Sequence, residues 1–169
     1  KETAEIAINA SLTGHLVLST LHTNDAPGSV TRLADMGVEP FMVASSLLGV
    51  IAQRLIRRVC TKCREEYTPS EYQLQEMGMR EAPQGAVFYR AKGCPTCANS
   101  GYHGRTVIHE LMVVDDYIKS LIVKNVDAGI LKKAAVERGM ITLREDGIAK
   151  VLQGVTTIDE LFRATHAEE

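Results

Sequence analysis

The 169-residue chain lacks several features that would mark its class at once. No apolar run approaches the roughly 18 residues that a membrane-spanning helix needs, so no such span is expected. The net charge is only −2, which points neither to nucleic acid nor to an anionic membrane surface. There is no internal repeat and no low-complexity segment, which argues against repeat architectures and against linkers of biased amino-acid composition. No G-x-x-x-x-G-K-[ST] phosphate loop occurs either, so spacing alone supports no catalytic claim.

The composition that is present is that of an ordinary globular protein. Forty-five per cent of the residues are hydrophobic and 24 per cent are charged, a balance that argues against disorder. The length suffices for one medium domain or two small ones with a real core. The chain begins with Lys1 and a helical pattern starts at once, so we expect a fragment of a longer protein.

Residues 1–59 read as a helix–strand–helix succession. Apolar spacing predicts a helix over 3–13 and a buried strand over 16–21. Asp25 is the expected N-cap of the next helix, and Pro40 opens another. The side chains expected to face inward on that last helix are Phe41, Ala44, Leu47 and Leu48. The order predicts an α/β fold with part of a parallel sheet, whose remaining strands are expected on the N-terminal side.

The character of the chain changes at Cys60. Prolines, glycines and all four cysteines gather in residues 60–105, which suggests a small inserted lobe. Residues 106–169 are expected to hold a returning strand and then a helical subdomain. The strand is expected over 106–114, and helices near 116–124, 128–138, 143–153 and 158–164. Capping boxes are predicted at Thr142–Glu145 and Thr157–Glu160, while residues 51–59 fit a strand or a helix equally well.

The cysteines form two C-x-x-C pairs, Cys60 with Cys63 and Cys94 with Cys97, separated by 30 residues. Each pair can place two thiolates on one side of a tight turn, and two such turns complete a tetrahedral zinc site. Because all four positions would be filled, such a site is structural and not catalytic. We therefore expect Cys60, Cys63, Cys94 and Cys97 to bind zinc, with His103 a bystander.

Other uses of the cysteines compete with zinc. Two disulfides would need an oxidising compartment. A redox-active dithiol needs one C-x-x-C pair and gives no reason for the second. Zinc is the interpretation that uses both pairs together.

A polar cluster, His22-Thr23-Asn24-Asp25, directly follows the predicted strand. Ligands of α/β proteins bind outside the carboxyl ends of strands, so His22 could contact a phosphate oxygen or position a water molecule. Ordinary helix capping by Asn24 or Asp25 explains the cluster equally simply. On pattern alone, we favour capping.

Four longer stretches of the chain resemble one family. They are TGHLVLSTLHTNDA, RLADMGVEPFMVASSLLGVIAQRLIRRVC, YRAKGCPTCANSGYHGRTVIHEL and GMITLREDGIAKVLQGVTTIDELFRAT. Together they are similar to the secretion ATPases of bacterial type II secretion and type IV pilus assembly, over essentially the whole chain. Within them, LHTNDA resembles the family's His box, and the cysteines resemble the tetracysteine zinc motif of its extension ATPases, which pilus retraction ATPases generally lack.

The resemblance implies a function for the full-length protein. Members are RecA-like hexameric ATPases at the cytoplasmic face of the bacterial inner membrane. They hydrolyse ATP with magnesium and drive pilus or pseudopilus assembly through an inner-membrane platform protein and a cytoplasmic-domain partner, without nucleic acid. By this resemblance His22 would lie near the γ-phosphate, and Arg32 is a weaker candidate for a nucleotide or intersubunit contact.

The same resemblance predicts that this chain does not hydrolyse ATP and binds it weakly at most. The family's phosphate loop, Asp box and Walker B acidic residue would all lie before Lys1. Half of a RecA-like sheet would also leave an unpaired edge, so we expect self-association or order confined to the cysteine and helical parts.

Two other functions are kept open. A stand-alone zinc module could bind nucleic acid through the basic residues between Arg54 and Arg64, although Tyr67 is the one aromatic residue near them. A redox protein could use the C-x-x-C pairs, provided that its thiols are metal-free and have a lowered pKa.

Overall fold

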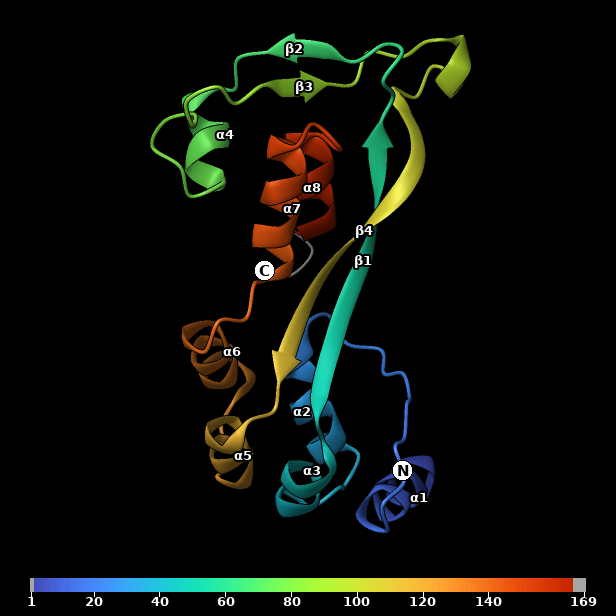
Figure 1. Ribbon diagram of the computed structural model, residues 1–169, viewed down its shortest axis with the longest axis vertical. Coiled ribbons are helices and arrows are strands. Elements are labelled where there is room, and N and C mark those ends of the chain that lie inside the picture. Colours follow the sequence, from blue (N-terminus) through green and yellow to red (C-terminus); the bar gives the residue numbers. More distant parts are fainter. Residues whose placement is uncertain (1, 166–169) are drawn as a thin grey trace. The chain divides into compact units, whose positions relative to one another are not determined.

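The computed structural model describes residues 2–165 and has an α/β architecture (Figure 1). The chain forms two compact units and enters each of them twice. The first unit holds the chain up to Ala52 together with His109–Thr142, and the second holds Gln53–Ile108 together with the chain from Leu143 on. Segments distant in sequence therefore share a unit.

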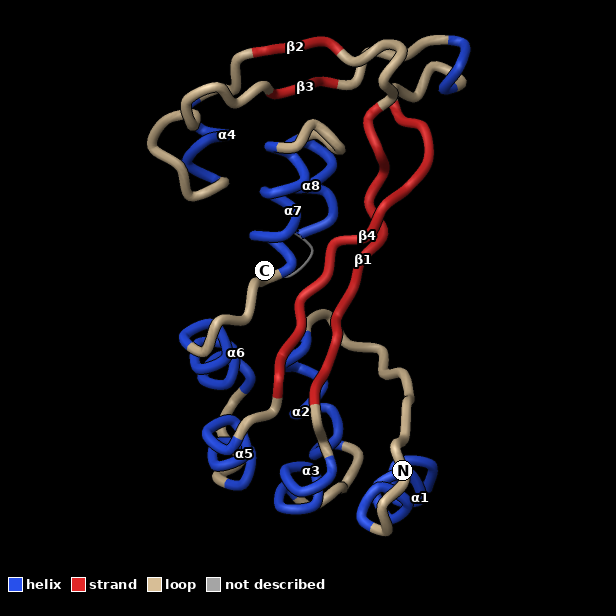
Figure 2. The backbone as a smooth tube through the Cα atoms, in the orientation of Figure 1, coloured by secondary structure: helices blue, strands red, loops and turns tan. Residues whose placement is uncertain are grey.

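The first unit is built mainly from helices, which appear as blue segments of the tube in Figure 2. They are α1 (Glu2–Leu12), α2 (Ala26–Asp35), α3 (Pro40–Ser46), α5 (Asp116–Val123) and α6 (Ala128–Glu137). Helix α3 contacts α1, α2 and α5, while α6 contacts α2 and α5. The predicted helices over 3–13 and after Asp25 and Pro40 are therefore confirmed within a residue or two.

Local signals explain where these helices begin and end. Gly14 has a φ of +97° directly after α1, as expected for a left-handed helix terminus. The Asp25 side chain accepts a hydrogen bond from the Gly28 amide at 2.8 Å, so it is the N-cap of α2. Two side chains expected to face inward do not, because Phe41 of α3 is 58% exposed and Leu48, beyond the helix, is 69% exposed.

The predicted strand over 16–21 is wrong. Residues 15–23 have no regular secondary structure, and Leu16 and Leu18 are 76% and 89% exposed. A strand exists only where a neighbouring strand exchanges backbone hydrogen bonds with it. No strand of residues 2–165 is paired with this segment, which is why its apolar side chains lie in solvent.

Two long strands, β1 (Gly49–Val59) and β4 (Tyr102–Val113), form a two-stranded sheet. The amide of Val114 donates to Leu48 at 3.0 Å, and the amide of Cys60 donates to Gly101 at 2.9 Å, so the strands are antiparallel. This assigns the ambiguous residues 51–59 to a strand and confirms the returning strand near 106–114. The expected parallel sheet is not present among residues 2–165, whose other sheet is also two-stranded and antiparallel.

The second unit combines the cysteine segment with the last two helices. Its remaining elements are β2 (Glu65–Tyr67), α4 (Glu71–Glu76), β3 (Phe88–Arg90), the 3-10 turn η1 (Pro95–Cys97), α7 (Leu143–Leu152) and α8 (Ile158–Thr165). Helices α7 and α8 pack against each other, and β2 pairs with β3. The core of this unit consists of Leu74, Met77, Phe88, Val151, Ile158 and Leu161.

The four C-terminal helices are all present but are shared between the units, α5 and α6 in the first and α7 and α8 in the second. Gly139 and Gly154, which follow α6 and α7, have φ angles of +95° and +68°, as a left-handed helix terminus requires. The box predicted at Thr157–Glu160 is half formed, since Thr157 Oγ1 accepts from the Glu160 amide at 3.2 Å. The Glu160 carboxylate is instead bound by two arginines. None of the helices described is long and apolar enough to cross a bilayer.

Candidate functional site

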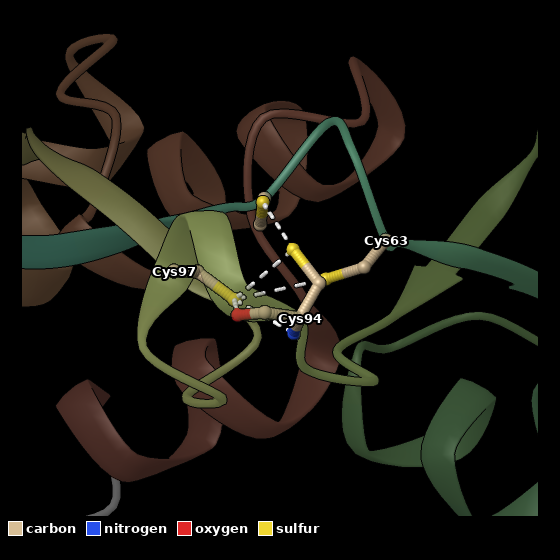
Figure 3. Close-up of side chains that lie close together, drawn as sticks. Cys63, Cys94 and Cys97 are labelled. Atoms are coloured by element: carbon tan, nitrogen blue, oxygen red, sulfur yellow. Dashed lines mark hydrogen bonds between the residues drawn. The ribbon is translucent and has the colours of Figure 1, made fainter.

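The four cysteine sulfurs of the second unit lie within 4.8 Å of one another (Figure 3). The Sγ–Sγ distance is 4.0 Å for Cys60 and Cys94, 3.8 Å for Cys63 and Cys97, and 3.7 Å for Cys94 and Cys97. Ligands about 2.3 Å from a tetrahedral zinc ion lie about 3.8 Å apart, whereas a disulfide needs about 2.05 Å. The four thiols are free, so their spacing fits a metal ion and not two disulfides. Exposed His103 is not in this group.

Each C-x-x-C pair is a tight turn. The Cys63 amide donates to the Cys60 carbonyl at 3.3 Å, and the Cys97 amide donates to the Cys94 carbonyl at 3.1 Å. Gly93 permits the approach to the second turn, because at its φ of +109° a Cβ atom would lie 2.7 Å from the backbone oxygen of Asn99. The two C-x-x-C turns therefore aim their sulfurs at one point.

Backbone amides act directly on the sulfurs. The amides of Cys94 and Gly101 each donate to Cys97 Sγ at 3.2 Å, and the Gly93 amide donates to Cys63 Sγ at 3.3 Å. Burial by itself would raise the pKa of Cys97, but these donors outweigh it and lower the pKa to about 6. Burial raises the pKa of Cys63 to about 12, and the crowded neighbouring sulfurs add to this. A bound divalent cation would reverse the rise in the pKa of Cys63, because it favours thiolates at all four positions.

The basic residues near the first C-x-x-C turn are engaged inside the second unit. Arg54 donates to the Ala164 carbonyl at 2.7 Å, and Arg64 donates to the Gly154 carbonyl at 2.9 Å. Arg57 forms a two-point contact with the Glu160 carboxylate at 2.9 and 2.6 Å. Three of the five basic residues considered for nucleic acid therefore have internal acceptors.

His22 lies in the first unit with its side chain exposed, directly before a closely held turn. Thr23 Oγ1 lies 2.7 Å from Ser29 Oγ, and Asp25 Oδ2 lies 3.4 Å from Lys132 Nζ. Arg32, on α2, is also exposed. The cysteines and His22 belong to different units, and each group is described by itself.

Sequence reasoning missed the buried carboxyl group of Glu110. It is 1% exposed, and its Oε1 accepts a hydrogen bond from the Ala26 amide at 2.7 Å. The sequence pattern of β4 could have revealed this burial, because alternate side chains of a strand share a face and Glu110 alternates with the buried Ile108 and Met112. A carboxyl group at a core-facing position is unusual unless it has a specific partner.

Arg144, near the start of α7, makes a contact inside the second unit. Arg144 donates to the Glu76 carbonyl at 2.5 Å and lies 3.3 Å from the Glu76 carboxylate. Helix α7 is thereby tied to the end of α4.

Comparison with known proteins gives a consistent result. The family model described as "Type II/IV secretion system protein" matches residues 1–163. "Type IV pilus assembly ATPase PilB" of Thermus thermophilus is 52% identical over 97% of the chain and 19% of its own length. "Type II secretion system protein E" of Pseudomonas aeruginosa is 50% identical over 99% of the chain and 33% of its own length. "Type II secretion system ATPase E" of Vibrio cholerae is 49% identical over 97% of the chain and 32% of its own length.

The fold agrees with these sequence matches. A crystal structure of the pilus retraction motor PilT with bound ADP superposes with a TM-score of 0.63, covering 97% of this chain and 36% of that one at 23% identity. The chain spans between a fifth and a third of the length of the three curated relatives. Since the family model matches nearly every residue, the protein belongs to the type II/IV secretion system protein family.

Proposed function

We propose that this chain is part of a secretion or pilus assembly ATPase, in which it supplies one wall of the ATP site and a structural zinc site. The observation that carries this proposal is the family match over residues 1–163, which includes the His22 segment and all four cysteines. Relatives that bear the name ATPase match the chain at 49 to 52% identity.

In the ATP site, His22 would contact the γ-phosphate and Arg32 would be a second, weaker contact. The exposed imidazole beside a hydrogen-bonded turn suits this role, because a fixed donor needs little reorganisation when charge develops on a phosphate. Magnesium and the remaining phosphate contacts would come from a phosphate loop, and none occurs among these 169 residues. The 169-residue chain alone is therefore proposed to be inactive.

ATP turnover tests this division of roles. A full-length ATPase that contains this chain should hydrolyse ATP with magnesium, whereas the purified 169-residue chain should release no phosphate above a buffer blank. Turnover by the short chain that persists through a second purification step would overturn the proposed inactivity. No turnover by the full-length protein in any assembled state would overturn the proposed function.

Zinc is the proposed occupant of the four-cysteine site, because the sulfur spacing fits its bond length and thiolates are its usual ligands. Elemental analysis of the purified chain should find one zinc ion per chain. A Cys94→Ser/Cys97→Ser variant should lose it, and His103→Ala should retain it as a matched control. Wild-type protein with far less than one zinc ion per chain would refute the assignment.

The family resemblance also suggests the oligomeric state and the partners of the full-length protein. By family resemblance, the full-length protein would assemble as a hexamer with a RecA-like parallel sheet. It would act at the cytoplasmic face of the inner membrane, with a platform protein and a cytoplasmic-domain partner. The zinc lobe would offer a rigid surface to a neighbouring subunit or to the platform protein. Mass photometry of the full-length protein with nucleotide tests the hexamer, and a stable monomer would contradict it.

The nucleic-acid alternative is weaker, because Arg54, Arg57 and Arg64 already have internal acceptors. A salt titration with DNA or RNA would show a steep loss of affinity with salt if the phosphate backbone were bound. We expect no binding at physiological salt. The redox alternative would require metal-free thiols in the purified chain.

A further inference from the structure

We propose that Glu110 is a positioning residue that holds the turn after His22 and so fixes where the imidazole stands. This inference rests on the proposed function, because it assigns Glu110 a task in the same ATP site. It concerns a residue that lies 88 positions further along the chain, on strand β4.

The contact itself is short and buried. Glu110 Oε1 accepts the hydrogen bond of the Ala26 amide at 2.7 Å, and the two residues are 1% and 0% exposed. Ala26 is the first residue of α2, so its amide is one of the donors that a helix leaves without an internal partner. An acidic group near a helix N-terminus is also favoured by the helix dipole. Glu110 therefore binds the start of α2 from outside the helix.

The neighbouring bonds make the turn a small closed network. Asp25 accepts from the Gly28 amide at 2.8 Å, and Thr23 Oγ1 lies 2.7 Å from Ser29 Oγ. These bonds join the turn to α2, while the bond from Glu110 joins α2 to β4. His22 directly precedes this network, and the segment before it has no regular secondary structure. The turn after His22 is consequently its nearest rigid support.

This arrangement has a kinetic consequence for an imidazole that acts on a phosphate. A catalytic group must be held within about 0.5 Å of its productive position, and supporting hydrogen bonds provide that precision. Loss of the Glu110 bond would leave ATP binding to the phosphate loop intact but would let His22 drift. The expected signature is a lower kcat with little change in KM for ATP.

The first test uses the 169-residue chain and needs no activity. Hydrogen exchange by NMR would compare Glu110→Ala, which removes the acceptor, with Glu110→Gln, which keeps a side-chain oxygen that can accept. We expect the protection factor of the Ala26 amide to fall at least tenfold in Glu110→Ala and much less in Glu110→Gln. The ring signals of His22 should shift in Glu110→Ala. Unchanged Ala26 protection in a folded Glu110→Ala variant would overturn the inference.

Glu160→Gln is the matched control, because Glu160 is equally buried at 0% exposure but lies in the second unit. It should leave the Ala26 amide and the His22 ring unchanged. If Glu110→Ala does not fold, the Glu110→Gln and Glu110→Asp variants are compared instead. Equal Ala26 protection in wild type and the shortened Asp variant would then overturn the inference.

The second test separates this inference from the proposed function. In a full-length ATPase that contains this chain, Glu110→Ala should lower kcat at least fivefold with KM for ATP within twofold, and Glu110→Gln should recover most of the rate. Inactive wild type would overturn the proposed function and leave the hydrogen-exchange result standing. Active wild type with an equal loss in Glu110→Ala and Glu160→Gln would overturn the positioning role alone.

Discussion

The charge on Glu160 should make a measurable contribution to the stability of the second unit. Its side chain is 0% exposed, and its carboxylate accepts hydrogen bonds from the Arg57 amide, the Arg57 guanidinium and the Arg163 guanidinium. Arg57 also lies 4.0 Å above the Tyr102 ring, and the hydroxyl of Tyr102 is 2.8 Å from Thr157 Oγ1. Glu160 therefore joins α8 to β1 near the first C-x-x-C turn.

The magnitude follows from the pKa of this carboxyl group. Burial alone would raise the pKa, but the hydrogen bonds from Arg163 and Arg57 outweigh it and lower the pKa from 4.5 to about 2. At about 1.4 kcal/mol per pKa unit, the ionised state contributes about 3 kcal/mol. Because the folded pKa is the lower one, this stability is present above pH 4.5 and is lost as the pH falls from 4.5 towards 2.

Glu160→Gln should thus lower the free energy of unfolding by about 2–3 kcal/mol at pH 7, with the half-exposed arginines limiting the loss. Glu65→Gln is the matched control, since Glu65 also contacts two cations, Arg90 and Lys92, but at the surface. It should cost much less than Glu160→Gln, because solvent screens an exposed ion pair.

The assay is urea denaturation followed by circular dichroism, with zinc added to every sample, from pH 7 down to pH 3. Metal release at low pH would destabilise wild type and variant alike, so the quantity to follow is the gap between them. We expect the gap for Glu160→Gln to close below pH 4.5. Equal costs for the two substitutions, or a gap that does not depend on pH, would show that the charge on Glu160 does not stabilise the second unit.

Three further outcomes follow from the structure. Gly147→Ala should destabilise the chain by about 1–3 kcal/mol in urea denaturation, because its new Cβ would lie 2.3 Å from Leu161 Cδ1. Leu161→Ala should partly relieve this clash. If the two substitutions together cost the sum of their separate costs, the clash with Leu161 is not the cause. Asp25→Ala should cost about 0.5–2 kcal/mol through loss of the α2 N-cap, measured the same way, and a cost near zero would show that the cap is redundant. Residues 154–157 form hydrogen bonds with β1 and Arg64. Chelation of the metal should therefore raise their hydrogen exchange and leave residues 116–137 of the first unit protected. A uniform rise across both ranges would contradict the division into units.

Most helices could be predicted from the sequence because their signals are local. The N-cap at Asp25 and the left-handed glycines after α1, α6 and α7 act within a few residues of each helix end. Such signals work whatever the rest of the chain does. The pairing of β1 with β4 depends on contacts between distant residues, which is why residues 51–59 stayed ambiguous.

The error at residues 16–21 has the same origin. A short apolar run forms a strand only if a partner strand is available, and no strand of the described chain pairs with it. The exposed Phe41 and Leu48 show the same limitation, because helical periodicity identifies an apolar side chain without saying what covers it. The apolar pattern was therefore identified correctly, but the burial inferred from it was wrong.

The candidate sites were predictable to different degrees. The spacing of the cysteines identifies the two C-x-x-C turns, and the structure brings their four sulfurs together as that spacing suggested. The roles of Glu110 and Glu160 were not predictable, because their partners lie 84 and 103 residues away in sequence. Glu160 was even assigned a local role in a capping box, and the two arginines bind it instead.

The proposed role of His22 is tested most directly by ATP turnover of a full-length ATPase that contains this chain, with His22→Ala compared with His15→Ala. Both histidines are exposed and flank the same irregular segment, so the pair controls for removal of an imidazole. We expect His22→Ala to lower kcat at least tenfold at saturating ATP, while His15→Ala stays within twofold of wild type. Equal activity of the two variants would contradict this role.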